Sequence, residues 1–173
     1  GNLILSEEHG RTFNNALGKL DESISEMRRV AHNMMPEALM KLGLQQALQD
    51  FCDGLSESQK FKINCEFYGL EKRMESSVEI VVYRIIQELL TNAVKHAGAT
   101  TILAQVIRQD NNLSITVEDN GKGFEQSNTE IIKGAGLKNV KSRVDYLKGQ
   151  MDIQSTAGKG TSIHIDCQIE ENG

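Results

Sequence analysis

The chain has 173 residues, of which 39% are hydrophobic and 25% are charged, and its formal net charge is -5. An acidic protein lacks the clustered basic surface that neutralises nucleic-acid phosphates, so we expect no nucleic-acid partner. The sequence contains no apolar run approaching the roughly 18 to 20 residues that span a bilayer, so we expect no membrane segment. Three widely spaced cysteines without a CxxC pattern, Cys52, Cys65 and Cys167, predict reduced structural thiols in a reducing compartment.

The first part of the chain is predicted to be a long helix that packs against other helices. Between residues 12 and 35, apolar residues alternate spacings of four and three: Phe13, Leu17, Leu20, Ile24, Met27, Ala31 and Met34. Pro36, the only proline, ends or kinks this helix. One helix cannot bury such a seam alone, so a missing helix, a second subunit or both must cover it. The opening GNLIL has no helix cap before it, and we expect the chain to be a fragment.

From Leu44 onward, the pattern predicts strands interleaved with helices. Helical periodicity is found at 44–51, 76–97 and 137–148, and strand-like alternation at 60–67, 100–107, 112–119, 151–156 and 161–169. The turn sequence RQDNN joins two of these strands into a hairpin. This order predicts an α+β fold, a two-layer sandwich with a mixed β-sheet in one layer and helices in the other.

The segment QELLTNAVKHA, residues 87–97, carries an unusual polar stripe. At about 100° per residue, Glu88, Asn92, Lys95 and His96 fall on one narrow arc, opposite an apolar face. A solvated helix face has this pattern, and so does a site that holds a metal and a polyphosphate.

Two glycine-containing motifs follow. In VEDNGKGF, a strand ends at Asp119 and is followed at once by Asn120 and Gly121. The structural interpretation is a turn; the functional one gives Asp119 an acceptor role toward an amino group and lets a ligand lie on the bare backbone of the glycines. In KGAGLKNV, Gly134-x-Gly136 precedes a helix and exposes backbone N–H groups, as phosphate sites do, although this pattern alone is weak.

The order of these three motifs resembles the N, G1 and G2 boxes of the GHKL ATPase superfamily, and within it the sensor histidine kinases of two-component systems. MRRVAHNMMPEALMKLGLQQAL, residues 27–48, resembles the second dimerisation helix and linker of kinases related to nitrate and desaturase sensors. The resemblance implies the GHKL fold preceded by a dimerisation-type helix. It divides the chain into residues 1–43, a partial dimerisation and phosphotransfer region, and residues 44–173, an ATP-binding catalytic domain.

The resemblance also implies roles at the phosphate end of a nucleotide site, with ATP and Mg²⁺ as cofactors. Asn92 would give an amide oxygen to Mg²⁺, which prefers hard oxygen ligands. Glu88 would hold a metal-bound water or act as a base near the γ-phosphate, and the sequence leaves both open. Lys95 and His96 would face the phosphates.

At the base end, the resemblance implies that Asp119 accepts a hydrogen bond from the adenine amino group, partly through water. Thr161, in GKGTSI, would lie near that water. Four glycines, Gly121, Gly123, Gly134 and Gly136, would frame a flexible lid over the nucleotide, and the resemblance also implies that Leu137 binds the nucleotide.

The implied activity is transfer of the ATP γ-phosphate to a histidine, for relay to an aspartate of a response regulator, by a homodimeric parent protein. We expect the domain in the cytoplasm, and many relatives are anchored in a membrane. The family's phosphoacceptor histidine is followed by an acidic residue, whereas His9, His32 and His164 are not. We expect a surface His9, a structural His32 and a solvated His164, and a chain that binds Mg-ATP but does not autophosphorylate.

Two alternatives stay open. A catalytically silent GHKL scaffold or regulator would keep the heptad seam but would not need intact nucleotide residues. Another GHKL member, such as an anti-sigma-factor kinase or a DNA-repair or topoisomerase ATPase, would not need the dimerisation-helix resemblance at residues 27–48.

Overall fold

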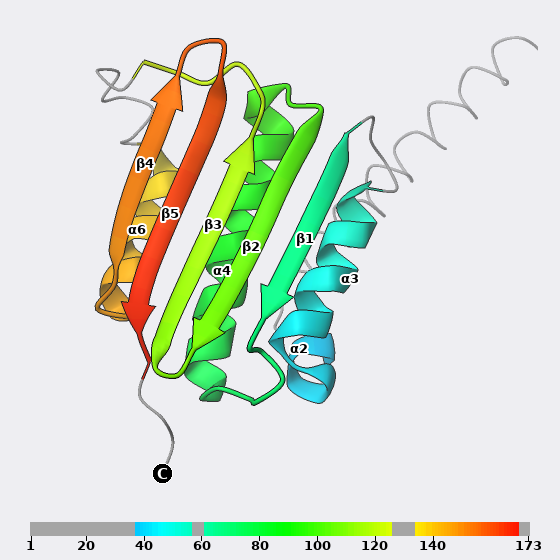
Figure 1. Cartoon of the computed structure of the whole chain (residues 1–173), viewed down its shortest axis with the longest axis vertical. Helices are drawn as coiled ribbons and strands as arrows, with labels where there is room; N and C mark the ends of the chain where they lie inside the picture. Colours follow the sequence, from blue (N-terminus) through cyan, green and yellow to red (C-terminus); the bar gives the residue numbers. More distant parts are fainter. Residues whose placement is uncertain (1–36, 57–60, 126–133, 170–173) are drawn as a thin grey trace, which may run out of the picture. The chain divides into compact units, whose positions relative to one another are not determined.

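The computed structural model describes residues 37–56, 61–125 and 134–169 (Figure 1). The chain divides into two compact units, Gly1–Glu37 and Ala38–Gly173. The helix predicted for residues 12–35 lies outside the described residues. The functional division at residues 43 and 44 therefore stays a prediction.

Helices and strands alternate along the second unit as predicted (Figure 1). The helical elements are α2 (Glu37–Leu42), α3 (Leu44–Ser56), α4 (Ser76–Asn92), the π-helical turn η1 (Ala93–Ala97) and α6 (Ala135–Tyr146). The strands are β1 (Lys62–Tyr68), β2 (Thr101–Gln109), β3 (Asn112–Asp119), β4 (Gln150–Thr156) and β5 (Gly160–Gln168). None of the helices in this described part is long and apolar enough to cross a membrane.

The five strands form one mixed sheet in the order β1-β2-β3-β5-β4. β1 runs parallel to β2, and the other neighbours are antiparallel. A parallel pair needs a long connection across the sheet, which α4 provides between β1 and β2. Helices α4 and α6 cover the same face of the sheet (Figure 1), so the α+β two-layer fold is confirmed.

The core lies between this face and the helices. Ile102, Ala104 and Val106 alternate as fully buried residues along β2, which confirms the predicted strand period. On α3, the predicted apolar residues are all buried, and Phe51 packs edge-on against Tyr83 of α4 with ring centroids 6.1 Å apart. Each fully buried large side chain contributes about 1.5–3 kcal/mol, so packing fixes the position of α4. The three cysteines are free thiols.

The beginning of α4 is anchored by a buried carboxylate. Glu79 is only 2% exposed, and its oxygens accept hydrogen bonds from Arg73 Nε at 2.9 Å and Arg73 Nη2 at 2.7 Å. The backbone N–H of Met74 donates to the same carboxylate at 3.0 Å. Arg73 Nη2 also donates to the Leu39 carbonyl of α2 at 3.2 Å. One ion pair thus joins α2 to the start of the helix that carries the polar stripe.

We expect Glu79→Ala to lower the free energy of unfolding by about 2–3 kcal/mol, because charge-assisted hydrogen bonds are lost and the Met74 N–H loses its partner. Urea denaturation measures this change. Asp145→Ala is the matched control: it breaks an exposed ion pair of 2.8 Å with Lys141 and should cost less than about 0.5 kcal/mol. Equal losses in the two variants would contradict the anchoring role of Glu79.

Candidate functional site

The topology brings the first two motifs together at one end of the sheet. α4 leads through η1 into the start of β2, and β3 runs antiparallel to β2, so β3 ends where β2 begins. Ile102 of β2 pairs directly with Asp119 of β3. The end of α4, which carries Asn92, therefore lies near the end of β3.

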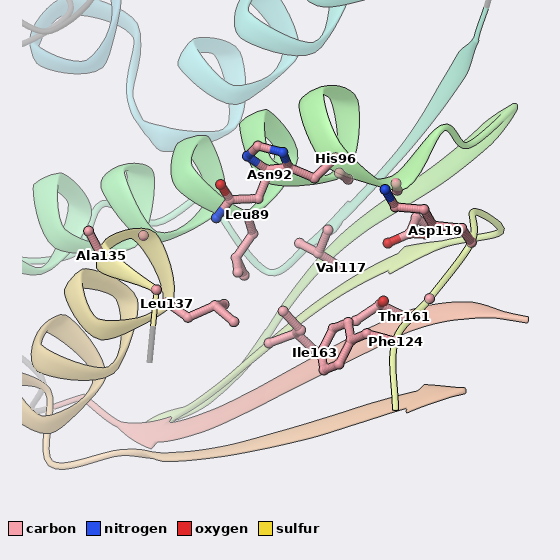
Figure 2. Close-up of a pocket in the computed structure, with 16 residues that line it drawn as sticks. Leu89, Asn92, His96, Val117, Asp119, Phe124, Ala135, Leu137, Thr161 and Ile163 are labelled. Atoms are coloured by element: carbon pink, nitrogen blue, oxygen red, sulfur yellow. The ribbon is translucent and has the colours of Figure 1, made fainter. Parts of the chain in front are cut away.

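A cavity of about 450 Å³ opens between α4, the ends of the strands and the start of α6 (Figure 2). This volume is within the range of small-molecule sites. Asp119 lies at one end of the cavity, and Ala135 and Leu137 lie at the other (Figure 2). Predicted site residues that line it are Asn92, His96, Asp119, Gly123, Gly134, Gly136, Leu137 and Thr161.

The last residues of the polar stripe lie in a π-helical turn rather than in the α-helix that the sequence predicted. The turn spans Ala93–Ala97 and ends at Gly98, which adopts a left-handed conformation with φ of 63°. His96 lines the cavity, whereas Lys95 is exposed and does not line it. A π turn spaces its side chains differently from the 100° steps assumed for the stripe. Lys95 and His96 are both exposed, and of the two only His96 lines the cavity.

Glu88 lies beside the cavity without lining it. A Cβ built on Gly136 would come within 2.5 Å of Glu88 Oε1 and 3.0 Å of Asn92 Nδ2. The start of α6 thus packs closely on the Glu88 and Asn92 side chains, at a position that accepts only glycine without a shift of these groups.

The start of α6 brings backbone N–H donors to the cavity. Gly134 precedes the helix and provides no side-chain cap, and the first turn contains no acidic residue. The first N–H groups of a helix have no partner within the helix and carry a partial positive charge. An anionic ligand group in the cavity would find these donors along Gly134 and Gly136.

At the other end of the cavity, Asp119 is held as an acceptor. Its Oδ1 accepts the Gly121 N–H at 2.8 Å. Burial raises the pKa of Asp119 above its ordinary value of 3.8, and backbone hydrogen bonds from Gly121 and Thr161 oppose this shift. Each carboxylate oxygen has two lone pairs, so Asp119 can accept a further hydrogen bond from a donor on a ligand.

The loop after Asp119 is fastened to the end of η1. Asn120 Oδ1 accepts the backbone N–H groups of Thr100 and Thr101, each at 2.9 Å. The Lys122 N–H donates to the Ala97 carbonyl at 2.8 Å. A Cβ on Gly121 would overlap that same carbonyl oxygen. Gly121 therefore does not line the cavity but permits the close backbone contact behind it.

Residues 77–171 match the family described as "Histidine kinase-, DNA gyrase B-, and HSP90-like ATPase". The chain belongs to this ATPase family. The family inferred from the three motifs is thus confirmed, and the described fold is its ATP-binding domain.

Named sensor kinases are among the relatives of this ATPase domain. Sensor histidine kinase ComP of Bacillus subtilis (strain 168) is 34% identical over 152 residues, which cover 87% of this chain and 20% of that protein. Signal transduction histidine-protein kinase/phosphatase DegS of Brevibacillus brevis is 34% identical over 148 residues, which cover 85% of this chain and 38% of that protein. The chain therefore spans between a fifth and two fifths of the length of these kinases.

A solved structure confirms the fold. The histidine kinase domain of the blue-light activated histidine kinase from Erythrobacter litoralis EL346 matches with a TM-score of 0.59. The match covers 74% of this chain and 60% of that domain at 20% sequence identity. It therefore supports the architecture and not particular residue roles.

Several cavity residues of the ATPase domain were not predicted as site residues. Their apolar members include Leu89, Ala93, Val117, Phe124 and Ile163. The alternation of apolar residues predicted that Val117 and Ile163 are buried. It could not predict that their side chains line a cavity rather than pack against other side chains. Lys122, inside the second motif, also lines the cavity.

His164, the other histidine among the described residues, does not line the cavity. His164 lies on β5 with a 45% exposed side chain, and its ring nitrogens bond to Thr116 Oγ1 and Asp166 Oδ2, each at 2.9 Å. The imidazole expected to be solvated is thus also partnered. His9 and His32 lie outside the described residues.

We expect Gly121→Ala to lower the free energy of unfolding by about 1–3 kcal/mol, since the new methyl group would force apart the loop and the end of η1. Thermal or urea denaturation measures the loss. Gly54→Ala is the matched control, because a Cβ there meets no atom within 4 Å and alanine favours the helix by about 0.5–1 kcal/mol. A Gly121→Ala protein as stable as Gly54→Ala would rule out the close contact.

Proposed function

We propose that this chain is the ATP-binding catalytic region of a two-component sensor histidine kinase and binds Mg-ATP in the 450 Å³ cavity. One observation carries the proposal. One cavity is lined by three groups from distant parts of the chain: Asn92, Asp119 and the start of α6 at Gly134–Gly136. Asp119 lies at the end suited to a base, and the start of α6 lies at the end suited to phosphates (Figure 2).

The base would occupy the Asp119 end. Asp119 offers a carboxylate oxygen to the exocyclic amino group of adenine. Val117, Ile163 and Leu89 provide apolar surface between the two ends of the cavity (Figure 2), which suits the faces of a purine. Thr161 adds a hydroxyl group beside Asp119, its pairing partner across β3 and β5.

The phosphates would occupy the α6 end. The backbone N–H groups at the start of α6, which have no partner within the helix, suit anionic oxygens. Asn92 and Glu88 bring an amide and a carboxylate to the same place beside Gly136, and hard oxygen donors are what Mg²⁺ prefers. The donor set fits a magnesium ion held by Asn92 and by the nucleotide itself. The bound ion would neutralise phosphate charge, and Glu88 would orient a water or accept a proton.

His96 and Lys122 line the cavity and complete its polar rim. Lys95 is exposed outside the cavity, so its proposed role toward phosphates is restricted to reaching a nucleotide from the rim. Phosphoryl transfer depends mainly on positioning and charge neutralisation, which this set of groups provides.

In the parent protein, the γ-phosphate would pass to a histidine and then to an aspartate of a response regulator. The relative ComP is named a sensor histidine kinase and DegS a signal transduction histidine-protein kinase/phosphatase, which supports this activity and a response-regulator partner. We propose a homodimeric parent from the resemblance of residues 27–48 to a dimerisation helix. A silent scaffold is the less favoured reading, because it would not require Asn92, Asp119 and the glycines to line one cavity.

Calorimetric titration of the chain with ADP, with and without Mg²⁺, tests the proposal. We expect binding that Mg²⁺ strengthens, and we expect Asn92→Ala to weaken Mg-ADP binding about tenfold while affecting metal-free ADP much less. Asn139→Ala is the matched control, because Asn139 is exposed on α6 and does not line the cavity. Full Mg-ADP affinity in Asn92→Ala would refute the magnesium role.

The pH dependence of binding tests Asp119. The ionised Asp119 carboxylate accepts a hydrogen bond from the adenine amino group more strongly than the protonated carboxyl group does. ADP affinity should therefore fall as the pH falls through the raised pKa of Asp119. The loss should begin at a higher pH than for an ordinary aspartate. Because the folded-state pKa is raised, protonation of Asp119 itself favours the folded state, and circular dichroism at each pH shows that the chain stays folded while its affinity falls.

Asp119→Asn should bind ADP weakly and lose this acid-side dependence. Since His96 also lines the cavity, the titration is repeated in a His96→Asn background, where the Asp119-dependent loss should persist. A pH profile that follows His96 instead would contradict the role of Asp119.

A further inference from the structure

Two of the three free cysteines meet where α3 packs on β1, away from the nucleotide cavity. Cys52 of α3 is 1% exposed, and Cys65 of β1 is partly exposed. Their thiol groups form a hydrogen bond with each other. Neither residue lines the cavity, so the pair has no part in the proposed function.

The packing of α3 on the edge strand β1 brings the two thiols together (Figure 1). Cys52 belongs to the buried residues of α3. Cys65 alternates along β1 with Ile63 and Phe67, and all three pack against the core. A disulfide requires two cysteines whose side chains point toward each other. The hydrogen bond between the thiols means that Cys52 and Cys65 meet this requirement.

The two thiols differ in how readily they ionise. Loss of the Cys52 proton would place a charge in the core, whereas a Cys65 thiolate can accept the Cys52 S–H as a hydrogen bond. This hydrogen bond lowers the pKa of Cys65, although partial burial and the Asp53 charge oppose the shift. The same hydrogen bond and burial raise the pKa of Cys52. Cys65 is therefore the nucleophile of the pair, and Cys52 is the thiol that keeps its proton.

We propose that Cys65 and Cys52 form an oxidation site for a hydroperoxide, in which Cys65 reacts first and Cys52 then closes a disulfide that fastens α3 to β1. A thiolate that solvent can reach is the form of cysteine that reacts with peroxides. A second thiol in contact with it captures the first product before further oxidation. In the reducing compartment expected for this chain, such a disulfide is transient, as suits a reversible modification.

The reaction proceeds in two steps. The Cys65 thiolate attacks one oxygen of hydrogen peroxide, the O–O bond breaks, and Cys65 becomes a sulfenic acid while hydroxide leaves and takes up the proton that Cys65 had released. The Cys52 sulfur then attacks the Cys65 sulfur. The S–S bond forms, the S–O bond breaks, and the leaving hydroxide takes the Cys52 proton to form water. In sum, two thiols are oxidised to one disulfide, and one peroxide is reduced to two water molecules.

Peroxide treatment of the folded chain tests the proposal. The reaction is stopped with catalase, the remaining thiols are alkylated in denaturant, and tryptic peptides are identified by mass spectrometry without reduction. Lys60 and Lys62 lie between the two cysteines, so trypsin places Cys52 and Cys65 in different peptides. We expect these two peptides to be joined by a disulfide that dithiothreitol breaks, and Cys167 to be alkylated as a free thiol.

Three outcomes would overturn the proposal. They are oxidation of Cys65 to a sulfinic or sulfonic acid while Cys52 stays free, a disulfide that includes Cys167, and a Cys65 thiol that peroxide leaves unchanged. The rate gives a further comparison. Cys167 donates to the Leu113 carbonyl at 3.7 Å, and burial raises the pKa of Cys167 to about 11. Cys65 should therefore react at least about tenfold faster than Cys167, and equal rates would contradict the assignment of Cys65 as the nucleophile.

Single substitutions separate the roles of the two cysteines. Cys52→Ala should stop the reaction at the Cys65 sulfenic acid, which dimedone traps, and should slow it because Cys65 loses its hydrogen bond. Cys65→Ser should leave the Cys52 thiol unmodified. Cys167→Ala is the matched control, since it keeps the pair and should form the disulfide as the unsubstituted chain does. A dimedone adduct on Cys52 in Cys65→Ser would contradict the proposed order of the two steps.

The thermal unfolding midpoint measures whether the disulfide fastens α3 to β1. A cross-link between two elements restricts the unfolded chain, so we expect the oxidised chain to unfold about 5–10 °C above the reduced chain. Dithiothreitol should abolish this rise. An unchanged or lower midpoint would mean that the disulfide distorts the packing, and would overturn the fastening of α3. These measurements use the unsubstituted chain, so they decide the proposal even where a variant does not fold, and they do not depend on nucleotide binding.

Discussion

Backbone hydrogen bonds between the end of η1, the start of β2 and the loop after β3 hold the site together. The Ala97 carbonyl accepts the Lys122 N–H at 2.8 Å, and the Thr101 carbonyl accepts the Asn120 N–H at 3.2 Å. These backbone bonds join the wall formed by α4 and η1 to the wall formed by the end of β3. Because no flexible side chain takes part in them, the two walls have little freedom to move relative to each other. The topology brings the walls near each other, and the bonds fix how Asn92 and Asp119 face the shared space.

The chemistry of the cavity is arranged along its length. A carboxylate and a hydroxyl group lie at the Asp119 end, apolar side chains lie in the middle, and helix N–H groups with oxygen ligands lie at the α6 end. A ligand with a donor-bearing ring at one end and an anionic chain at the other can enter in only one orientation. The distribution of polar and apolar groups along the cavity therefore determines the orientation of the ligand.

Most of the fold could be predicted from the sequence, because the alternation of apolar and polar residues along a strand indicates which face of the strand is buried. The hairpin of β2 and β3 and the buried residues of α3 are examples. Helix α2, six residues long, was not predicted separately because so short a segment shows no clear period. For the site, motif order led to Asn92 and Asp119, but a regular helical arc could not separate Lys95 from His96. Leu89 and Phe124 gave no signal, since only the packing of α4 and of the loop after β3 brings them to the same cavity.

The π-helical turn at Ala93–Ala97 has a consequence for how the chain tolerates insertions and deletions. Each hydrogen-bonded ring of a π turn contains one residue more than a ring of an α-helix. Deleting a single residue here would allow the regular ladder of α4 to continue and would rotate the following side chains by about 100°. His96 would leave the cavity, and the Ala97 carbonyl would no longer meet Lys122. This segment is therefore constrained in its length as well as in its residue types.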